Sequence, residues 1–339
     1  MVRRALVPTL LGLFVLAGCS GTGTGGSAAA VALRVAAPVH EPTWSDHARA
    51  LFALTDDARI AKIDPSGGAR TTLSAPFPDA GEDLVTRVTQ AAVYLPQPKL
   101  GRVALVDDAD LRQTETIAAG PSPSYLALDS GADALLALSE DGSTVTPLDL
   151  HDNTVAPTQD VHAGPDAELD GAKRGRRIDY HVAGPNGVTH FRGSPGSVRS
   201  TGEIAISAEK TAGDLTKSSR LYIAEKGTDR LLAVDSTRGE GGLKVVAQAR
   251  LGEPVHYVGV DETRIYAATE HKLVVFKTNS FEGYPNQTFP VVTTIDFRSA
   301  LADEAPRDAP LSGLAVGPDR VYLALKGQPW VVSIAKPSI

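Results

Sequence analysis

One short apolar hairpin recurs along this chain of 339 residues at a nearly constant spacing. Each copy has a short apolar run, a polar turn and a second apolar run that ends on a small polar or charged residue. These closing residues stand at positions 64, 107, 149, 192, 235, 277 and 335. Every step but the last is 42 or 43 residues, so the repeat is a structural unit and sets the architecture.

The composition of the repeat predicts strands. Its apolar runs are too short for paired helices, and Gly, Asp and Pro separate them. A strand-rich repeat of about 40–45 residues is typical of propeller blades. The seven copies therefore predict an all-β chain that forms a seven-bladed β-propeller.

The ends of the repeat array predict how the ring closes. Apolar runs at 125–129, 257–261 and 311–316 are expected to be innermost strands of the third, sixth and last blades. The last blade then has only three strands, and the run at 31–36 is expected to supply the fourth. The long final step predicts an insertion at about 279–310, rich in Pro, Asp and Glu.

The strand and junction motifs allow a family resemblance to be named. Second strands end on sequences such as Leu-Ala-Val-Asp at 232–235, and Gly120-Pro121 precedes an innermost strand. These units resemble the YVTN/YncE-type and NHL-like seven-bladed propellers, and in overall form the chain is similar to propeller lipoproteins of actinobacterial envelopes. The Trp-Asp pair of WD40 repeats is absent, because neither Trp44 nor Trp330 precedes Asp. The resemblance implies the fold but no single activity, since such propellers include binders, scaffolds, lyases and lactonases.

The N-terminus predicts export and lipid attachment. Arg3 and Arg4 precede the apolar run 5–17, which fits a signal-peptide core and is shorter than the ~20 residues that span a bilayer. The run ends in Leu-Ala-Gly-Cys19, which resembles the bacterial lipobox, where the cysteine is acylated and the chain is cut before it. We therefore expect a lipoprotein signal peptide at 1–18, a flexible tether with lipidated Cys19 at 19–30, and a propeller at 31–339. The expected location is the extracytoplasmic face of the cell membrane.

Three histidines are the candidate metal ligands. His162, His181 and His190 lie near several acidic residues, and imidazole with carboxylate can hold zinc. A zinc-binding chaperone or sensor is therefore one alternative function. The spacings of 19 and 9 residues fit no local zinc motif, however, and His181 and His190 fall in expected strands. We predict no metal site and no cofactor.

A propeller enzyme of lactonase or lyase type is the other alternative. It would need acidic, Asn or His residues around the central channel, and Glu203, Asp129, His256 and Asp261 are candidates. Asp at a blade turn more often forms the turn itself. The chain has no Gly-x-Ser-x-Gly elbow and no phosphate-binding Gly-Lys-Ser/Thr loop, so no catalytic residue is predicted.

Charged and aromatic segments suggest surfaces for partners. The net charge of −7 gives no reason to expect nucleic acid. The basic run 173–177 is expected either to touch anionic lipid or a cell-wall polymer, or to be a solvated loop. Phe281, Tyr284, Phe289 and Phe297 either anchor a partner or pin the insertion to the propeller.

The absence of a convergent catalytic set favours binding over catalysis. The predicted function is a lipid-anchored, extracytoplasmic binding or scaffold module for a protein or envelope component at the membrane surface.

Overall fold

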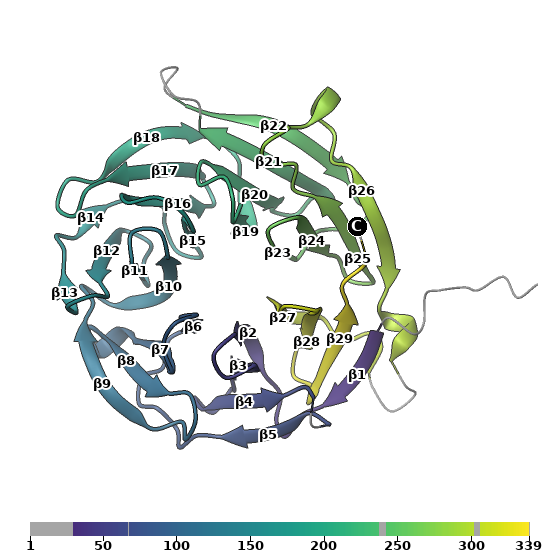
Figure 1. Ribbon diagram of the computed structural model, residues 1–339, viewed down its shortest axis with the longest axis horizontal. Helices are drawn as coiled ribbons and strands as arrows, with labels where there is room; N and C mark the ends of the chain where they lie inside the picture. The colour runs from purple at the N-terminus through teal and green to yellow at the C-terminus, as the bar shows by residue number, and fades with distance from the viewer. Residues whose placement is uncertain (1–29, 67, 237–241, 302–305, 339) are drawn as a thin grey trace, which may run out of the picture.

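The structure, a computed structural model, describes residues 30–66, 68–236, 242–301 and 306–338. The predicted signal peptide and Cys19 lie outside these residues. The described chain forms seven antiparallel sheets that stand around a central channel as the blades of a β-propeller (Figure 1). The predicted fold class is confirmed.

Each blade runs from an innermost strand at the channel to an outer strand at the rim. The innermost strands are β2 (His40–Ser45), β6 (Val85–Thr86), β10 (Pro123–Asp129), β15 (Glu168–Gly171), β19 (Ala208–Gly213), β23 (Tyr257–Val260) and β27 (Leu311–Val316). The second strands are β3 (Ala50–Leu54), β7 (Ala92–Gln97), β11 (Ala134–Ser139), β16 (Ile178–Gly184), β20 (Arg220–Glu225), β24 (Arg264–Ala268) and β28 (Arg320–Leu325). The third strands are β4 (Ile60–Asp64), β8 (Arg102–Asp107), β12 (Thr144–Asp149), β17 (Gly187–Gly193), β21 (Arg230–Ser236), β25 (Lys272–Lys277) and β29 (Trp330–Ala335).

The outer strands are shorter or more exposed than the rest. They are β5 (Arg70–Leu73), β9 (Gln113–Ala118), β13 (Thr154–Val155), β18 (Arg199–Ile204), β22 (Leu243–Arg250), β26 (Val291–Asp296) and β1 (Ala30–Arg34). The short β14 (Gln159–Asp160) also pairs with β12. In the part of the chain that the structure describes, the 3-10 turns are η2 (Pro98–Leu100), η3 (Pro285–Gln287) and η4 (Arg298–Ala300). Among the described residues, no helix has the length and apolar character needed to cross a membrane.

The seven predicted hairpins are the second and third strands of the seven blades. These strands are apolar on both sides because each side packs against a neighbouring blade; all five residues of β3, for example, are buried. The described residues form seven hydrophobic clusters, one between each pair of adjacent blades. The apolar runs that gave the period are therefore the residues that hold the ring together.

The predicted closure of the ring is also confirmed. Strand β1 pairs antiparallel with β29, from Ala30 opposite Ile334 to Arg34 opposite Trp330. Strand β29 thus has a partner on each side, and the last blade has four strands. The N-terminal strand removes the edge that β29 would otherwise expose.

The segment predicted as an insertion at 279–310 is only partly an insertion. It contains β26, the outer strand of blade six, which pairs with β25. Three of its six residues, Val291, Thr294 and Asp296, are exposed and only Ile295 is buried, so this strand did not stand out as an apolar run. Phe289 and Phe297 are buried, so they pin the segment to the propeller, whereas Phe281 is 88% exposed.

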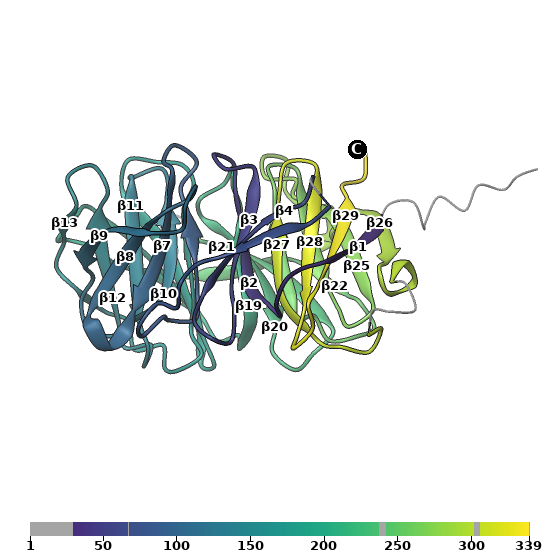
Figure 2. The same cartoon turned by 90° about the horizontal axis from the view of Figure 1, so that it is seen from below.

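The strand order defines two faces of the ring. Successive strands of a blade run in opposite directions. The innermost strand of each blade therefore begins on the side that also carries the turn between the second and third strands. The links from one blade to the next lie on this side too. We call this side the mouth face. The opposite side, the base face, carries the turns that join first to second and third to outer strands. Figure 2 shows the ring edge-on, and β29 ends on the base face.

Candidate functional site

Polar side chains from six blades meet at the mouth of the central channel. Each belongs to the start of an innermost strand or to the residues just before it, and they line one cavity. They are Glu41, Asp83, Tyr125, Glu168, Lys210 and Tyr257. Because the blades surround one axis, equivalent positions of successive blades converge here (Figure 1).

Lys210 is the centre of this cluster. Its Nζ lies 2.9 Å from Glu168 Oε1 and 3.1 Å from Glu41 Oε1. The same ammonium group lies 5.6 Å from the ring centroid of Tyr125 and 5.7 Å from that of Tyr257. Burial acts to lower the pKa of Lys210, but the acidic groups around it outweigh burial and hold the pKa well above its ordinary value. The lysine is therefore a fixed positive charge at the channel mouth.

Two of the carboxyl groups near Lys210, those of Asp83 and Glu168, have raised pKa values. Burial, reinforced by the charge of Glu41, raises the pKa of Asp83 to about 8. Two backbone N–H groups, of Leu84 and Leu126, donate to Asp83 and oppose this shift. Burial also raises the pKa of Glu168, although Lys210 opposes it. Asp83 is thus mostly protonated at neutral pH, which limits the excess negative charge in the channel.

Pairing within the cluster limits what it can do chemically. Its three carboxyl groups are the kind of lining that a propeller enzyme would need, but Lys210 bridges Glu41 and Glu168, and Tyr125 Oη donates to Glu168 at 3.0 Å. Within the described ranges there is no group of three His, Cys, Asp or Glu residues that could hold a metal ion. The positive charge in this cluster is the ammonium group of Lys210, a side chain of the protein itself.

The channel candidates predicted from sequence lie elsewhere or have structural partners. Glu203 is on the outer strand β18, so its assignment to the channel is wrong. Asp129 is fully buried and accepts hydrogen bonds from three backbone N–H groups, while Asp261 accepts from the turn after β23 and from Tyr266 Oη and Lys336 Nζ. His256 Nε2 lies 3.9 Å from Glu270 Oε2, outside the residues that line the channel. The two aspartates are turn-forming residues, as their positions suggested.

Two of the three candidate metal ligands meet inside blade four. His181 and His190 face each other across β16 and β17, with ring centroids 4.5 Å apart. Both nitrogens of His190 are occupied, Nε2 by Asp179 Oδ1 at 2.5 Å and Nδ1 by Thr201 Oγ1 at 2.7 Å. Burial and the neighbouring His190 lower the pKa of His181 well below its ordinary value, so its ring is neutral. This arrangement serves packing, since His190 offers no free nitrogen to a metal.

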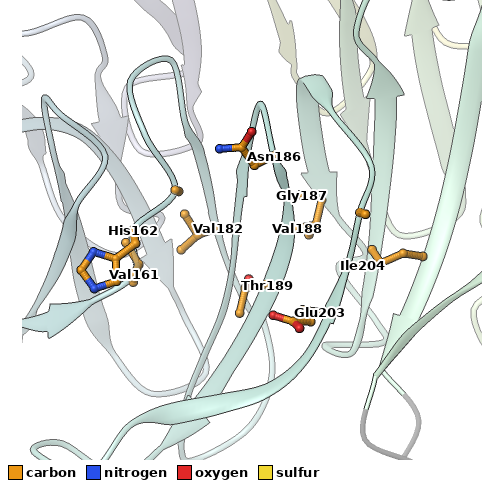
Figure 3. A pocket seen from close by; sticks show the side chains of 11 residues that line it. Val161, His162, Val182, Asn186, Gly187, Val188, Thr189, Glu203 and Ile204 are labelled. Carbon is orange, nitrogen blue, oxygen red and sulfur yellow. The ribbon is translucent and has the colours of Figure 1, made fainter.

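His162 lies apart from that pair, in a groove on the mouth face of blade four. The groove is lined by the link before β15, the turn between β16 and β17, and the end of β18. His162, Asn186 and Glu203 are exposed there, and Thr189 forms part of its floor (Figure 3). The groove is open, polar at its rim and apolar at the half-buried side chains of Val161 and Ile204.

The channel cluster was missed in the sequence although a signal for it exists. Positions 41, 83, 125, 168 and 210 follow one another by 42 or 43 residues, which is the period of the hairpins. A comparison of the residues at equivalent positions of successive repeats would have grouped Glu41, Asp83, Tyr125, Glu168 and Lys210. The sequence does not show which of them pair, because this depends on how far each side chain reaches into the channel.

Similar solved structures support the fold, whereas comparisons of the sequence find no relative. No family model and no curated protein match the sequence. A chain of the mitotic checkpoint complex shares 12% identity with a TM-score of 0.68, covering 99% of both chains. The WD40 repeats of RRP9 share 12% identity with a TM-score of 0.68, covering 91% of this chain and 98% of that one. A chain of hydrazine synthase from Kuenenia stuttgartiensis shares 12% identity, with a TM-score of 0.66 and coverage of 90% and 97%. At this identity the likeness concerns the fold alone.

Proposed function

We propose that this chain is a lipid-anchored propeller on the extracytoplasmic face of a cell membrane, where it binds a protein or an envelope polymer. The lipobox-like sequence ending in Cys19 supports the anchor. The fold supports binding, because β-propellers are commonly protein-binding scaffolds and one similar chain belongs to the mitotic checkpoint complex. The resemblance to YVTN/YncE- or NHL-like propeller lipoproteins is part of the same proposal.

The observation that carries this proposal is the internally paired channel mouth. Lys210 binds Glu41 and Glu168 within the chain, and Tyr125 donates to Glu168. These four groups, which a catalytic channel would offer to a substrate, are therefore already paired with one another. A rigid ring with such a centre suits a surface that recognises a partner rather than one that transforms a substrate.

The groove of blade four is the best place for that partner on the mouth face. It combines exposed polar side chains at its rim, His162, Asn186 and Glu203, with apolar side chains below them. Its walls come from strands and short turns, so little ordering is needed on binding. A peptide segment or polymer chain could lie along it and use both kinds of contact.

Site-specific photo-crosslinking in isolated membranes tests this assignment. A crosslinking residue at Asn186, in the groove, is expected to yield one discrete protein or polymer adduct that excess purified protein competes away. The matched control is Ser194, which is exposed in the turn between β17 and β18 on the base face of the same blade. Absence of an adduct at Asn186, or the same adducts from both positions, would contradict the proposal.

A further inference from the structure

A basic loop stands on the base face between β15 and β16. Arg174, Arg176 and Arg177 are all exposed in it. Arg174 is fixed at the loop's root: its Nε donates to the carbonyl of Leu215 at 3.3 Å, and its Nη2 lies 3.6 Å from Glu262 Oε1. Among the residues that the structure describes, Arg176 and Arg177 make no ion pair or side-chain hydrogen bond, so their charges face solvent.

The same face carries the most exposed aromatic side chain of the described residues. Phe281 is 88% exposed and lies between β25 and β26, in the turn on the base face of blade six. Its loop is firmly held: Ser280 Oγ donates to Asp214 Oδ2 at 2.6 Å, and the rings of Tyr284 and Phe289 stack edge to face at 4.9 Å. A rigid loop thus presents a phenyl ring to water, which costs free energy unless something covers it.

The basic loop and Phe281 belong to one surface. Arg174 contacts Leu215, and Ser280 contacts Asp214, so both loops pack against the same turn after β19 in blade five. We define the basic-aromatic patch as Arg174, Arg176, Arg177 and Phe281. The patch also borders the exposed acidic residues Glu262 and Glu282, so its positive charge is concentrated in the basic loop.

The chain enters the propeller on this same face. Ala30 pairs with Ile334 near the end of β29, and β29 ends on the base face. Ten residues, 20–29, separate Cys19 from Ala30, and a flexible chain of this length would span roughly 15 to 20 Å on average. An anchor at Cys19 would therefore keep the base face close to the bilayer.

Both faces carry charges of both signs, so the basic loop rather than a net difference between the faces provides the attraction to lipid. The mouth face exposes acidic turn residues and also lysines: Asp56, Asp57, Glu140, Asp141, Lys99, Lys226 and Lys326. The base face exposes acidic residues too, but its three arginines lie together in one loop, and an anionic lipid surface attracts such a local group of positive charge. The basic loop and the entry of the chain thus point to the same face for the membrane.

We propose that the basic-aromatic patch docks on an anionic lipid surface, with the arginines at the phosphate groups and Phe281 at the boundary of the acyl chains. This inference rests on the proposed membrane location and adds an orientation to it. The base face lies on the bilayer, and the mouth face with the groove of blade four points away from it, toward partners.

Vesicle binding by the chain from residue 19 onward, with Cys19→Ser to remove acylation, tests the patch without the anchor. We expect binding to vesicles of phosphatidylcholine with phosphatidylglycerol, at low salt, and much weaker binding to phosphatidylcholine alone. The double reversal Arg176→Glu with Arg177→Glu should weaken this binding at least about tenfold. Each arginine near an anionic surface adds to the attraction, and each glutamate in its place is repelled. Phe281→Ala should weaken it about threefold or more.

The matched control reverses two exposed lysines of the mouth face, Lys226→Glu with Lys326→Glu. It changes the net charge by the same amount and should leave vesicle binding within about twofold. Thermal unfolding of every variant checks that folding is intact. Equal weakening by both reversals, or equal binding to both kinds of vesicle, would overturn the docking proposal. The partner-binding proposal would be unaffected, because no partner takes part in this assay.

Discussion

Deletion of Ala30–Arg34 is expected to lower the free energy of unfolding of the propeller by about 3–5 kcal/mol. This corresponds to about 1 kcal/mol for each residue of β1 that no longer pairs with β29. Strand β1 pairs with β29 along its whole length, and Leu33 packs into the cluster between blades seven and one. Without β1, the buried residues Val331, Val332 and Ile334 would lie on β29 at an unpaired edge of the sheet. We therefore expect a melting temperature roughly 5–15 °C lower, with concentration-dependent aggregation.

Peptide complementation provides the control for this deletion. A synthetic peptide of residues 30–36 should bind the deleted protein and restore most of the lost melting temperature. The same peptide with Ala32 and Leu33 replaced by proline should not, because proline cannot donate a hydrogen bond to β29. An unchanged melting temperature after deletion would show that the ring does not depend on this closure.

The substitution Lys210→Met is expected to cost about 2–4 kcal/mol at pH 8. It leaves Glu41 and Glu168 without their common cation, and removing one partner of a buried pair is strongly destabilising. The lower end of this range allows for the partial exposure of Lys210, whose side chain is 19% accessible. Denaturant unfolding measured at two pH values gives the result directly.

The pH dependence identifies the cause of this loss. The folded-state pKa values of Asp83, about 8, and of Glu168 are raised by burial, so the folded state binds more protons than the unfolded state above about pH 4. Stability from these groups therefore falls as pH rises toward the raised pKa values. Without Lys210 the pKa of Glu168 rises further, so the deficit of Lys210→Met should be small near pH 5 and largest at pH 8.

Two further variants separate charge from packing. Lys226→Met removes an exposed lysine of the same blade and should change stability by less than about 0.5 kcal/mol at both pH values. Adding Glu168→Gln to Lys210→Met should recover part of the loss at pH 8. An equal deficit at pH 5 and pH 8 would mean that Lys210 contributes by packing rather than by charge.

The sequence predicts the ring because the residues that define its period are the residues that hold it together. Second and third strands are buried on both sides, so their apolar runs stand out; outer strands such as β9, five of whose six residues are exposed, do not. The same cause hid β26 inside a segment predicted as an insertion. The pairing of His181 with His190 follows from the hairpin whose turn is centred on 185–186, since residues equidistant from a turn face each other.

The candidate site could be predicted less well. The hairpin period locates the positions of Glu41, Asp83, Glu168 and Lys210, but their ion pairs and pKa shifts depend on burial in the channel. Residue type alone does not place a side chain in the channel: Glu203 was a channel candidate but lies on the outer strand β18. The basic-aromatic patch joins loops of blades four and six that are about a hundred residues apart in the sequence. Only the folded ring brings these loops close together.

The central claim, that this propeller is held at a membrane by lipid on Cys19, is tested most directly by the mass of the mature N-terminal peptide. Protein extracted from membranes of the producing cell, digested and analysed by mass spectrometry, should begin at Cys19 and carry the added mass of two or three acyl chains. A mature chain that begins at another residue, or that begins at an unmodified Cys19, would contradict the claim.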